Sequence, residues 1–133
     1  SEYTVTSDFD RMGCRLEGPF IAQKETSDII SDGTVFGSVQ VPSHGKPIIL
    51  LADRQTTGGY AKIATVASVD IPKVVQRKTD HKIRFRAITV EEAQELYLKE
   101  VQELDGMRRI IHQPCKEVLE CRLVAKRLRK LFE

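Results

Sequence analysis

The residues best suited to chemistry stand together in the segment Asp53-Arg-Gln-Thr-Thr-Gly-Gly-Tyr-Ala-Lys62. Gln55 offers an amide that can pair with a lactam, urea or amide group as both donor and acceptor. Tyr60 could orient a substrate or pass a proton, and Lys62 or Arg54 could hold a carboxylate or stabilise a developing oxyanion. Apolar stretches flank the segment on both sides, so we expect these polar groups to cluster at one end of the core.

Two interpretations of Gly58-Gly59 remain open from the residue types alone. Glycine permits a positive φ and lets the backbone approach a ligand closely, which favours a binding site. A Gly-Gly pair is also a good hairpin turn, and charged residues at its rim would then be solvated loop residues. Residue chemistry by itself favours the turn slightly.

A second polar cluster lies in Ser7-Asp-Phe-Asp-Arg-Met-Gly-Cys-Arg-Leu-Glu-Gly18, where Arg11 and Arg15 follow two acidic residues. Paired arginine and aspartate side chains can lock a loop to the rim of a barrel through bidentate hydrogen bonds. The same arginines could instead bind the carboxylate of a ligand. Structural locking is the favoured interpretation.

Phosphate, metal and thiol chemistry find little support. Gly59-Tyr-Ala-Lys62 lacks the spacing of a phosphate-binding loop. The spacing of His112, Cys115 and Cys121 matches no common zinc pattern, so no metal site is predicted. Cys14 falls in an apparent strand with no histidine nearby in the sequence, which makes a nucleophile improbable.

The elements that must position these residues change in kind near residue 88. Before it, frequent glycine and proline residues separate short apolar runs, which predicts a mainly β domain over residues 1–88. Apolar residues on both parities predict that 49–52 and 63–69 are buried on both faces, as in a small closed β-barrel. The expected strands are 3–6, 14–17, 36–41, 47–52, 61–69 and 81–87, with one helical turn over 70–76, where Asp70 is the N-cap and Pro72 lies in the first turn.

Residues 89–133 are predicted to form a helical tail of two helices. Thr89-Val-Glu-Glu92 is a capping box for the first, and Gly106 is a plausible stop. Pro114 marks the second, whose apolar stripe runs from Val118 to Phe132. The segment 91–105 has six acidic residues and one lysine, whereas 116–133 has six basic and three acidic residues. An antiparallel hairpin would pair these charges, and a membrane or nucleic-acid contact is the less favoured alternative.

Composition limits the class of protein. The 133 residues carry a net charge of +2, with 30% charged and 41% hydrophobic residues, which fits one globular domain and not a dedicated nucleic-acid binder. The longest apolar run is far shorter than the roughly 20 residues of a membrane span. Three cysteines and the lack of an apolar leader sequence predict a cytoplasmic protein.

Three of these segments together resemble the allophanate hydrolase subunit 2 family. They are Ser7–Pro19, Gly37-Ser-Val-Gln-Val-Pro42 and the stretch from Pro47 to Val66 that contains Asp-Arg-Gln-Thr-Thr-Gly-Gly-Tyr. The resemblance runs in unbroken order from about Ser7 to Tyr97. The family includes KipA, the C subunit of bacterial 5-oxoprolinase, and part of the carboxyltransferase region of urea carboxylase.

The resemblance implies a cyclophilin-like closed β-barrel that works beside a KipI-like B subunit and a 5-oxoprolinase A subunit. It implies ATP-dependent opening of 5-oxoproline to L-glutamate, with ATP required by the assembled complex. Gln55, Tyr60 and Lys62 are the candidate catalytic residues, since they suit an amide-like N–C=O group. The candidate substrate-binding residues are Asp53, Arg54, Thr56, Thr57, Gly58, Gly59, Arg11, Arg15 and Gln40.

Two other functions stay open within this family. One is a non-catalytic KipA-type regulator that binds and counteracts KipI, an inhibitor of a sporulation histidine kinase. The other is a carboxyltransferase of the urea carboxylase or allophanate type, which is disfavoured because the chain contains no biotin-related segment. The chain departs from the family in having Ala61 where proline is common, Ala64 where glycine is common and Cys14 where tyrosine is frequent. It also corresponds to only the C-terminal half of the family's chains, so an active site shared between halves would be incomplete here.

Overall fold

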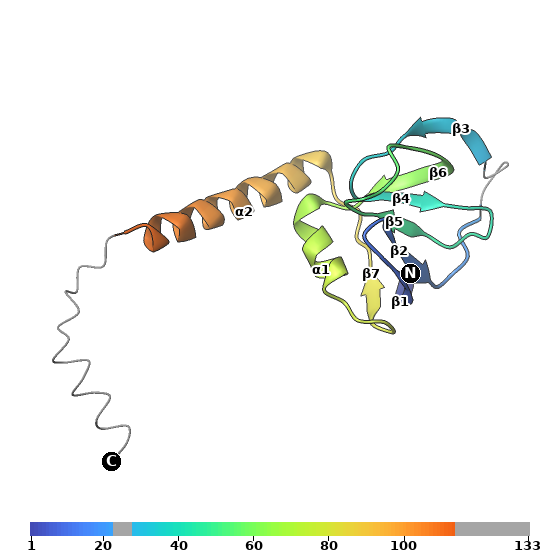
Figure 1. The fold of residues 1–133 in the computed structure, drawn as a ribbon, viewed down its shortest axis with the longest axis horizontal. Helices are drawn as coiled ribbons and strands as arrows, with labels where there is room; N and C mark the ends of the chain where they lie inside the picture. Colours follow the sequence, from blue (N-terminus) through green and yellow to red (C-terminus); the bar gives the residue numbers. More distant parts are fainter. Residues whose placement is uncertain (23–27, 114–133) are drawn as a thin grey trace, which may run out of the picture. The chain divides into compact units, whose positions relative to one another are not determined.

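The computed structural model describes residues 1–22 and 28–113, and the chain divides into two compact units, Ser1–Glu100 and Val101–Glu133. The first unit is mainly β-structure, as predicted, and a long helix begins near its end. In chain order the elements are β1 (Glu2–Phe9), β2 (Gly13–Glu17), β3 (Asp28–Gly33), β4 (Ser38–Val41), β5 (Ile48–Leu50), β6 (Thr57–Thr65), a 3-10 turn (Ser68–Asp70), α1 (Ile71–Val75), β7 (Lys82–Arg84) and α2 (Val90–Ile111) (Figure 1). Within the described ranges, no helix has the length and apolar character needed to cross a bilayer.

All seven strands belong to one antiparallel sheet with the order β3-β6-β4-β5-β2-β1-β7. The outer strands are β3 and β7, and no ladder joins them within the described residues. Closure of the sheet into a barrel therefore stays a prediction. Strands β1 and β7 are held together by charge as well as by their ladder, because the Glu2 carboxylate accepts hydrogen bonds from Arg84 at 2.9 and 3.0 Å.

One face of the sheet forms the apolar core. Strands β1 and β2 alternate along their length, so that Val5, Cys14 and Leu16 are buried while Arg15 and Glu17 point to the other face. The core cluster consists of Tyr3, Val5, Cys14, Leu16, Val39, Ile49, Leu51, Ile71 and Val74. Helix α1 contributes the last two of these residues, so it packs against the sheet through its apolar side.

Strand β4 lies inside the sheet and is buried over its whole length. Val39 belongs to the core cluster, whereas Gln40 points to the opposite face and is 5% exposed. A buried polar side chain on a central strand costs free energy unless it finds hydrogen-bonding partners. Gln40 thus places a buried polar group on the second face of the sheet, where it needs hydrogen-bonding partners.

The helices begin as the sequence predicts. Pro72 lies in the first turn of α1, although the Asp70 carboxylate makes no capping bond and instead pairs with Lys73 at 2.6 Å. The capping box of α2 is confirmed: the Thr89 backbone N–H donates to Glu92 Oε2 at 3.0 Å, and the Glu92 N–H donates to Thr89 Oγ1 at 3.2 Å.

The expected stop at Gly106 is wrong, because α2 continues to Ile111. A glycine inside a helix costs only about 1 kcal/mol relative to alanine. Basic residues in the last turn (Arg108 and Arg109) interact favourably with the helix dipole. The predicted second helix, its apolar stripe and the antiparallel hairpin lie outside the described residues.

Three strand predictions also need correction. The segment 28–33 forms β3, which the sequence pattern does not predict. Strand β6 begins at Thr57, four residues before the predicted start, so Gly58-Gly59 lies inside a strand and is not a hairpin turn. The predicted burial of 63–69 on both faces is wrong, since Ile63 is 53% exposed. Its neighbours in the second half of β6 are exposed as well.

Candidate functional site

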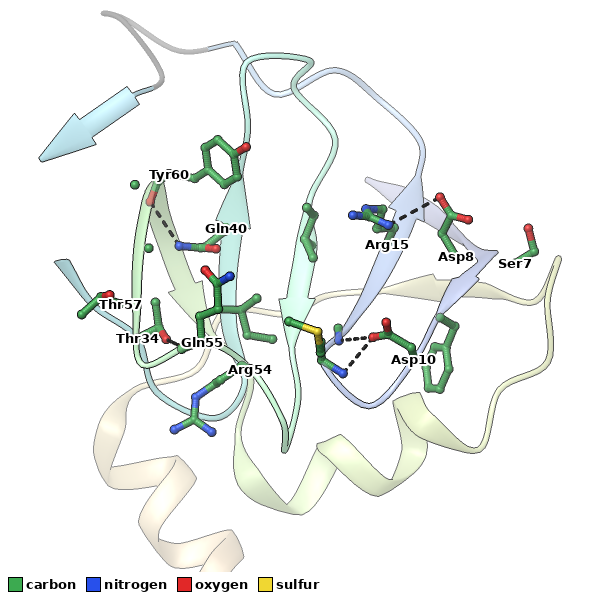
Figure 2. Close-up of a pocket in the computed structure, with 17 residues that line it drawn as sticks. Ser7, Asp8, Asp10, Arg15, Thr34, Gln40, Arg54, Gln55, Thr57 and Tyr60 are labelled. Atoms are coloured by element: carbon green, nitrogen blue, oxygen red, sulfur yellow. Dashed lines mark hydrogen bonds and ion pairs between the residues drawn. The ribbon is translucent and has the colours of Figure 1, made fainter. Parts of the chain in front are cut away.

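A pocket of about 450 Å³ lies over the polar face of the sheet. Its size falls within the range of small-molecule sites. Strands β2, β4 and β5 contribute to it, together with the end of β1, the first half of β6 and the loops before β2, β4 and β6 (Figure 2). The lining residues are Ser7, Asp8, Phe9, Asp10, Met12, Gly13, Arg15, Thr34, Gln40, Ile48, Leu50, Arg54, Gln55, Thr57, Gly58, Gly59 and Tyr60.

Gln40 is held in one orientation by β6. Its Nε2 donates a hydrogen bond to the backbone carbonyl oxygen of Tyr60 at 3.5 Å (Figure 2). The amide lies directly over Gly58, where an added Cβ would be 2.5 Å from Nε2. The close approach that glycine permits is therefore real at this position, and the group that approaches is the side chain of Gln40.

Gln55 projects from the loop that precedes β6. Thr34, which is almost fully buried, fixes this loop: its hydroxyl donates to the Gln55 carbonyl oxygen and its backbone N–H donates to the Thr56 carbonyl oxygen at 2.9 Å. The Gln55 amide itself makes no hydrogen bond in the part of the chain that the structure describes. Figure 2 shows it in the same pocket as the Gln40 amide. The pocket therefore presents two amide groups, one fixed and one available.

The other wall is formed by the polar cluster near the N-terminus. Asp10 Oδ1 accepts hydrogen bonds from the backbone N–H groups of Met12 and Gly13 at 2.8 and 2.9 Å, so this carboxylate is used to shape the loop. Arg15 points into the pocket from β2, and its Nη1 lies 3.6 Å from Asp8 Oδ2. In this cluster Asp10 thus orders the loop, while Arg15 lines the pocket.

Lys62, predicted as a catalytic residue, does not line the pocket. Its Nζ lies 2.6 Å from Asp32 Oδ2 and also donates to the Gly33 carbonyl oxygen, so it ties β6 to β3. The hydrogen bond from Lys62, with a further one from the Gly33 N–H, lowers the pKa of Asp32 below its ordinary value. The structure separates Lys62 from the two other candidate catalytic residues, Gln55 and Tyr60.

Three candidate substrate-binding residues also lie outside the pocket lining. Arg11 is 89% exposed at its side chain and forms an ion pair with Asp53, with 3.1 Å between Nε and Oδ2. Thr56 is exposed, and its backbone carbonyl oxygen accepts the hydrogen bond from the Thr34 N–H. The remaining candidates, Arg54, Thr57, Gly58, Gly59, Arg15 and Gln40, all line the pocket.

Arg54 contributes to the lining in a different direction from the amides. Its Nη1 donates to the Leu51 carbonyl oxygen at 3.5 Å, and its Nε is buried without a hydrogen-bond partner among the described residues. In Figure 2 the guanidinium group points away from Gln40 and Gln55. Arg15 is therefore the better placed cation for a ligand that contacts those amides.

Sequence reasoning missed several lining residues. Ile48 and Leu50 have the pattern of core residues, and only the sheet pairing shows that they face the pocket. Thr34 precedes β4 and carries no sequence signal that would single it out. Asp8 and Asp10 stand out in the sequence only as acids near two arginines. Among residues 1–22 and 28–113, no group of three His, Cys, Asp or Glu side chains is arranged to hold a metal ion.

Comparison with known proteins places this chain in a defined family. Residues 1–87 match the family described as carboxyltransferase domain, subdomain A and B, and the chain belongs to it. The chain is 43% identical over 113 residues to the C subunit of 5-oxoprolinase from Haemophilus influenzae, covering 85% of this chain and 37% of that protein. It is 38% identical over 93 residues to the C subunit of 5-oxoprolinase from Escherichia coli, covering 70% of this chain and 30% of that one.

A solved structure supports the fold. The Kluyveromyces lactis urea carboxylase matches 80% of this chain with a TM-score of 0.75 and 22% identity, and the match covers 10% of that protein. The chain spans about a third of the length of the curated relatives that it matches. The family membership rests on the sequence match, and the urea carboxylase likeness supports the fold alone.

Proposed function

We propose that this chain forms part of the C subunit of an ATP-dependent 5-oxoprolinase. In this proposal it acts with a KipI-like B subunit and a 5-oxoprolinase A subunit to open 5-oxoproline to L-glutamate in the cytoplasm. The assembled complex, and not a site in this chain alone, uses the ATP. Two curated relatives carry the name of such a C subunit, and their matches cover most of the chain, which supports the assignment.

The observation that carries the proposal is the pair of amides in the pocket. 5-Oxoproline contains a lactam, whose N–H is a donor and whose C=O is an acceptor. The side-chain amides of Gln40 and Gln55 offer a hydrogen-bond acceptor and donors, and they line the same pocket as the Tyr60 ring. We assign Gln55 and Tyr60 to the lactam carbonyl, where negative charge develops when the ring is attacked. Lys62 is left out of this assignment because Asp32 and Gly33 hold it elsewhere.

We also propose that the open edges of the sheet are covered in the longer protein, completing the predicted closed barrel. The relatives are about three times as long as the stretch that matches them, so additional chain is available for this purpose. An isolated fragment is accordingly expected to lack the complete activity. The decisive assay must use the full-length protein in complex with its partners.

The test is release of glutamate from 5-oxoproline and ATP by the assembled enzyme. Gln55→Ala should lower kcat/KM by about 10- to 100-fold, since a lost donor to a developing oxyanion costs a few kcal/mol at most. Gln94→Ala removes an exposed glutamine from α2 and serves as the matched control. Loss of activity only in Gln55→Ala supports the site.

Two results would contradict the proposal in different ways. Equal activity of Gln55→Ala and Gln94→Ala would remove Gln55 from the active site. A wild-type assembly that releases no glutamate, yet relieves KipI inhibition of the histidine kinase, would replace the enzymatic function with the regulatory one. Urea-dependent consumption of carboxybiotin by the same assembly would identify the carboxyltransferase alternative.

A further inference from the structure

The floor of the pocket places an arginine and an amide in one row across three strands. Arg15 of β2 is the register partner of Ile48 of β5, and Ile48 is the register partner of Gln40 of β4. Neighbouring strands are about 4.8 Å apart, so the backbones at Arg15 and Gln40 are separated by roughly 10 Å. All three residues line the same pocket. The row therefore consists of a cation and an amide with an apolar side chain between them.

The fixed orientation of Gln40 determines what this amide can offer to a ligand. Tyr60 presents a carbonyl oxygen, which only accepts, so the Gln40 nitrogen must face it. The Gln40 Oε1 is left as an acceptor and has no hydrogen-bond partner within the described part of the chain. An acceptor of this kind at a pocket gains a hydrogen bond when a ligand brings in a donor. The group that Gln40 selects is accordingly an N–H.

Arg15 at the other end of the row keeps most of its hydrogen-bonding capacity. Its guanidinium has five N–H donors, and its contact with Asp8 is a single ion pair at 3.6 Å with both side chains more than half exposed. Asp10, the other carboxylate of this wall, accepts from two backbone N–H groups of its own loop. A guanidinium with free edges binds a carboxylate through two parallel hydrogen bonds.

We propose that Arg15 and Gln40 form a two-part recognition site for a small molecule that carries both a carboxylate and an amide N–H. Arg15 binds the carboxylate, Gln40 Oε1 accepts from the N–H, and the apolar part of the ligand lies over Ile48. The inference rests on the proposed function and narrows it, because it selects N-unsubstituted lactam carboxylates over neutral ureas. Arg15 and Gln40 are thus binding residues that determine specificity.

Each half of the ligand can be tested separately by NMR titration of the full-length protein. The probes are 5-oxoproline, 2-pyrrolidinone (lactam only), cyclopentanecarboxylate (carboxylate only) and N-methyl-5-oxoproline (no N–H). Arg15→Gln should weaken the binding of 5-oxoproline and cyclopentanecarboxylate by about 10- to 100-fold and leave the binding of 2-pyrrolidinone unchanged. Gln40→Met should weaken the binding of 5-oxoproline and 2-pyrrolidinone by roughly 3- to 10-fold and leave the binding of cyclopentanecarboxylate unchanged.

Matched measurements keep the test independent of folding. Arg77→Gln changes an exposed arginine outside the pocket and should alter none of the affinities. N-methyl-5-oxoproline tests Gln40 in the wild-type protein, where it should bind roughly 3- to 10-fold more weakly than 5-oxoproline. Because this comparison uses only the wild-type protein, it decides the question even where Gln40→Met does not fold.

The outcomes separate this inference from the proposed function. If the selective pattern appears but the wild-type assembly makes no glutamate, the reaction is wrong and the recognition site stands. If glutamate is formed but each variant weakens the binding of 2-pyrrolidinone and cyclopentanecarboxylate equally, or weakens the binding of neither, the recognition site is wrong. Equal binding of 5-oxoproline and its N-methyl derivative would also overturn the role of Gln40.

Discussion

Replacing Gly58 by alanine is expected to displace the Gln40 amide and destabilise the protein. The added Cβ would lie 2.5 Å from Gln40 Nε2, so this nitrogen must retreat by almost 1 Å to reach the 3.4 Å of ordinary van der Waals contact. Its hydrogen bond to the Tyr60 carbonyl is already 3.5 Å long and would be lost. A buried polar group without its partner costs about 1–3 kcal/mol. Alanine recovers about 0.4–1 kcal/mol through the entropy of the unfolded chain, which leaves a net loss of about 1–2 kcal/mol.

Urea unfolding of the full-length protein measures this loss, with Gly33→Ala as the matched control. Gly33 lies on the neighbouring strand β3, and an added Cβ there would meet no atom within 4 Å. The control should gain about 0.4–1 kcal/mol of stability, because only the unfolded-state entropy changes. The two substitutions are therefore expected to change the free energy of unfolding in opposite directions. If Gly58→Ala is as stable as Gly33→Ala, the contact with Gln40 does not hold the amide in place and the argument for its orientation fails.

Four further outcomes are expected from three residues away from the pocket. Burial raises the pKa of the Cys14 thiol to about 11 from its ordinary 9.0. In a variant whose other cysteines are serine, iodoacetamide should therefore label the native protein at least about 100-fold more slowly than the urea-unfolded protein. Equal labelling rates would refute this. The same shift in pKa makes stability fall between about pH 9 and pH 11, since the unfolded chain loses the proton first. Hydrogen bonds from Lys82 and then Arg84 lower the pKa of Glu2 below its ordinary 4.5. The contribution of Glu2 to stability is therefore complete above pH 4.5 and is lost as the pH falls through the lowered pKa. Glu2→Gln should flatten the acid side of a curve of stability against pH. Gly106→Ala should raise the helicity measured by circular dichroism and stabilise α2 by about 1 kcal/mol, and a decrease would show that Gly106 has a backbone role.

Elements with an alternating or continuous apolar pattern could be predicted from the sequence. Strands β1 and β2 alternate, β5 is apolar throughout, and α2 begins with a capping box whose four residues are sufficient to mark it. These signals are local, because they depend on which face of a strand or helix is buried. The predicted β-structure followed by a helix is confirmed for that reason.

Strand β3 and the start of β6 could not be predicted, because their residues disfavour strands when considered alone. Asp28–Gly33 contains two aspartates and a glycine, and Thr57 is followed by two further glycines. Such residues are depleted in strands, and here the pairing of β3 with β6 and of β6 with β4 overrides the local preference. At position 58 the absence of a Cβ leaves the space that the Gln40 amide occupies.

The composition of the pocket could be predicted only in part, for a related reason. Gln55, Tyr60 and Arg15 can be found by residue type, but the position of Lys62 depends on a partner, Asp32, that lies thirty residues earlier on an unpredicted strand. The row of Arg15, Ile48 and Gln40 depends on the register of three strands. Register follows from the pairing of whole strands, and a shift by one residue would turn every side chain to the other face.

The ladder between β1 and β7 has a consequence for the order in which the sheet can fold. It joins Glu2 to Arg84, so β1, the earliest of the seven strands to be synthesised, waits for the latest one before its outer edge is paired. Contacts of such long sequence separation form slowly, because the intervening chain must first be ordered. The strands β2, β4 and β5 of the pocket floor, by contrast, are complete by Leu50. A nascent chain should therefore acquire much of the binding surface while β1 still exposes an unpaired edge, and that interval is when chaperones or partner proteins matter most.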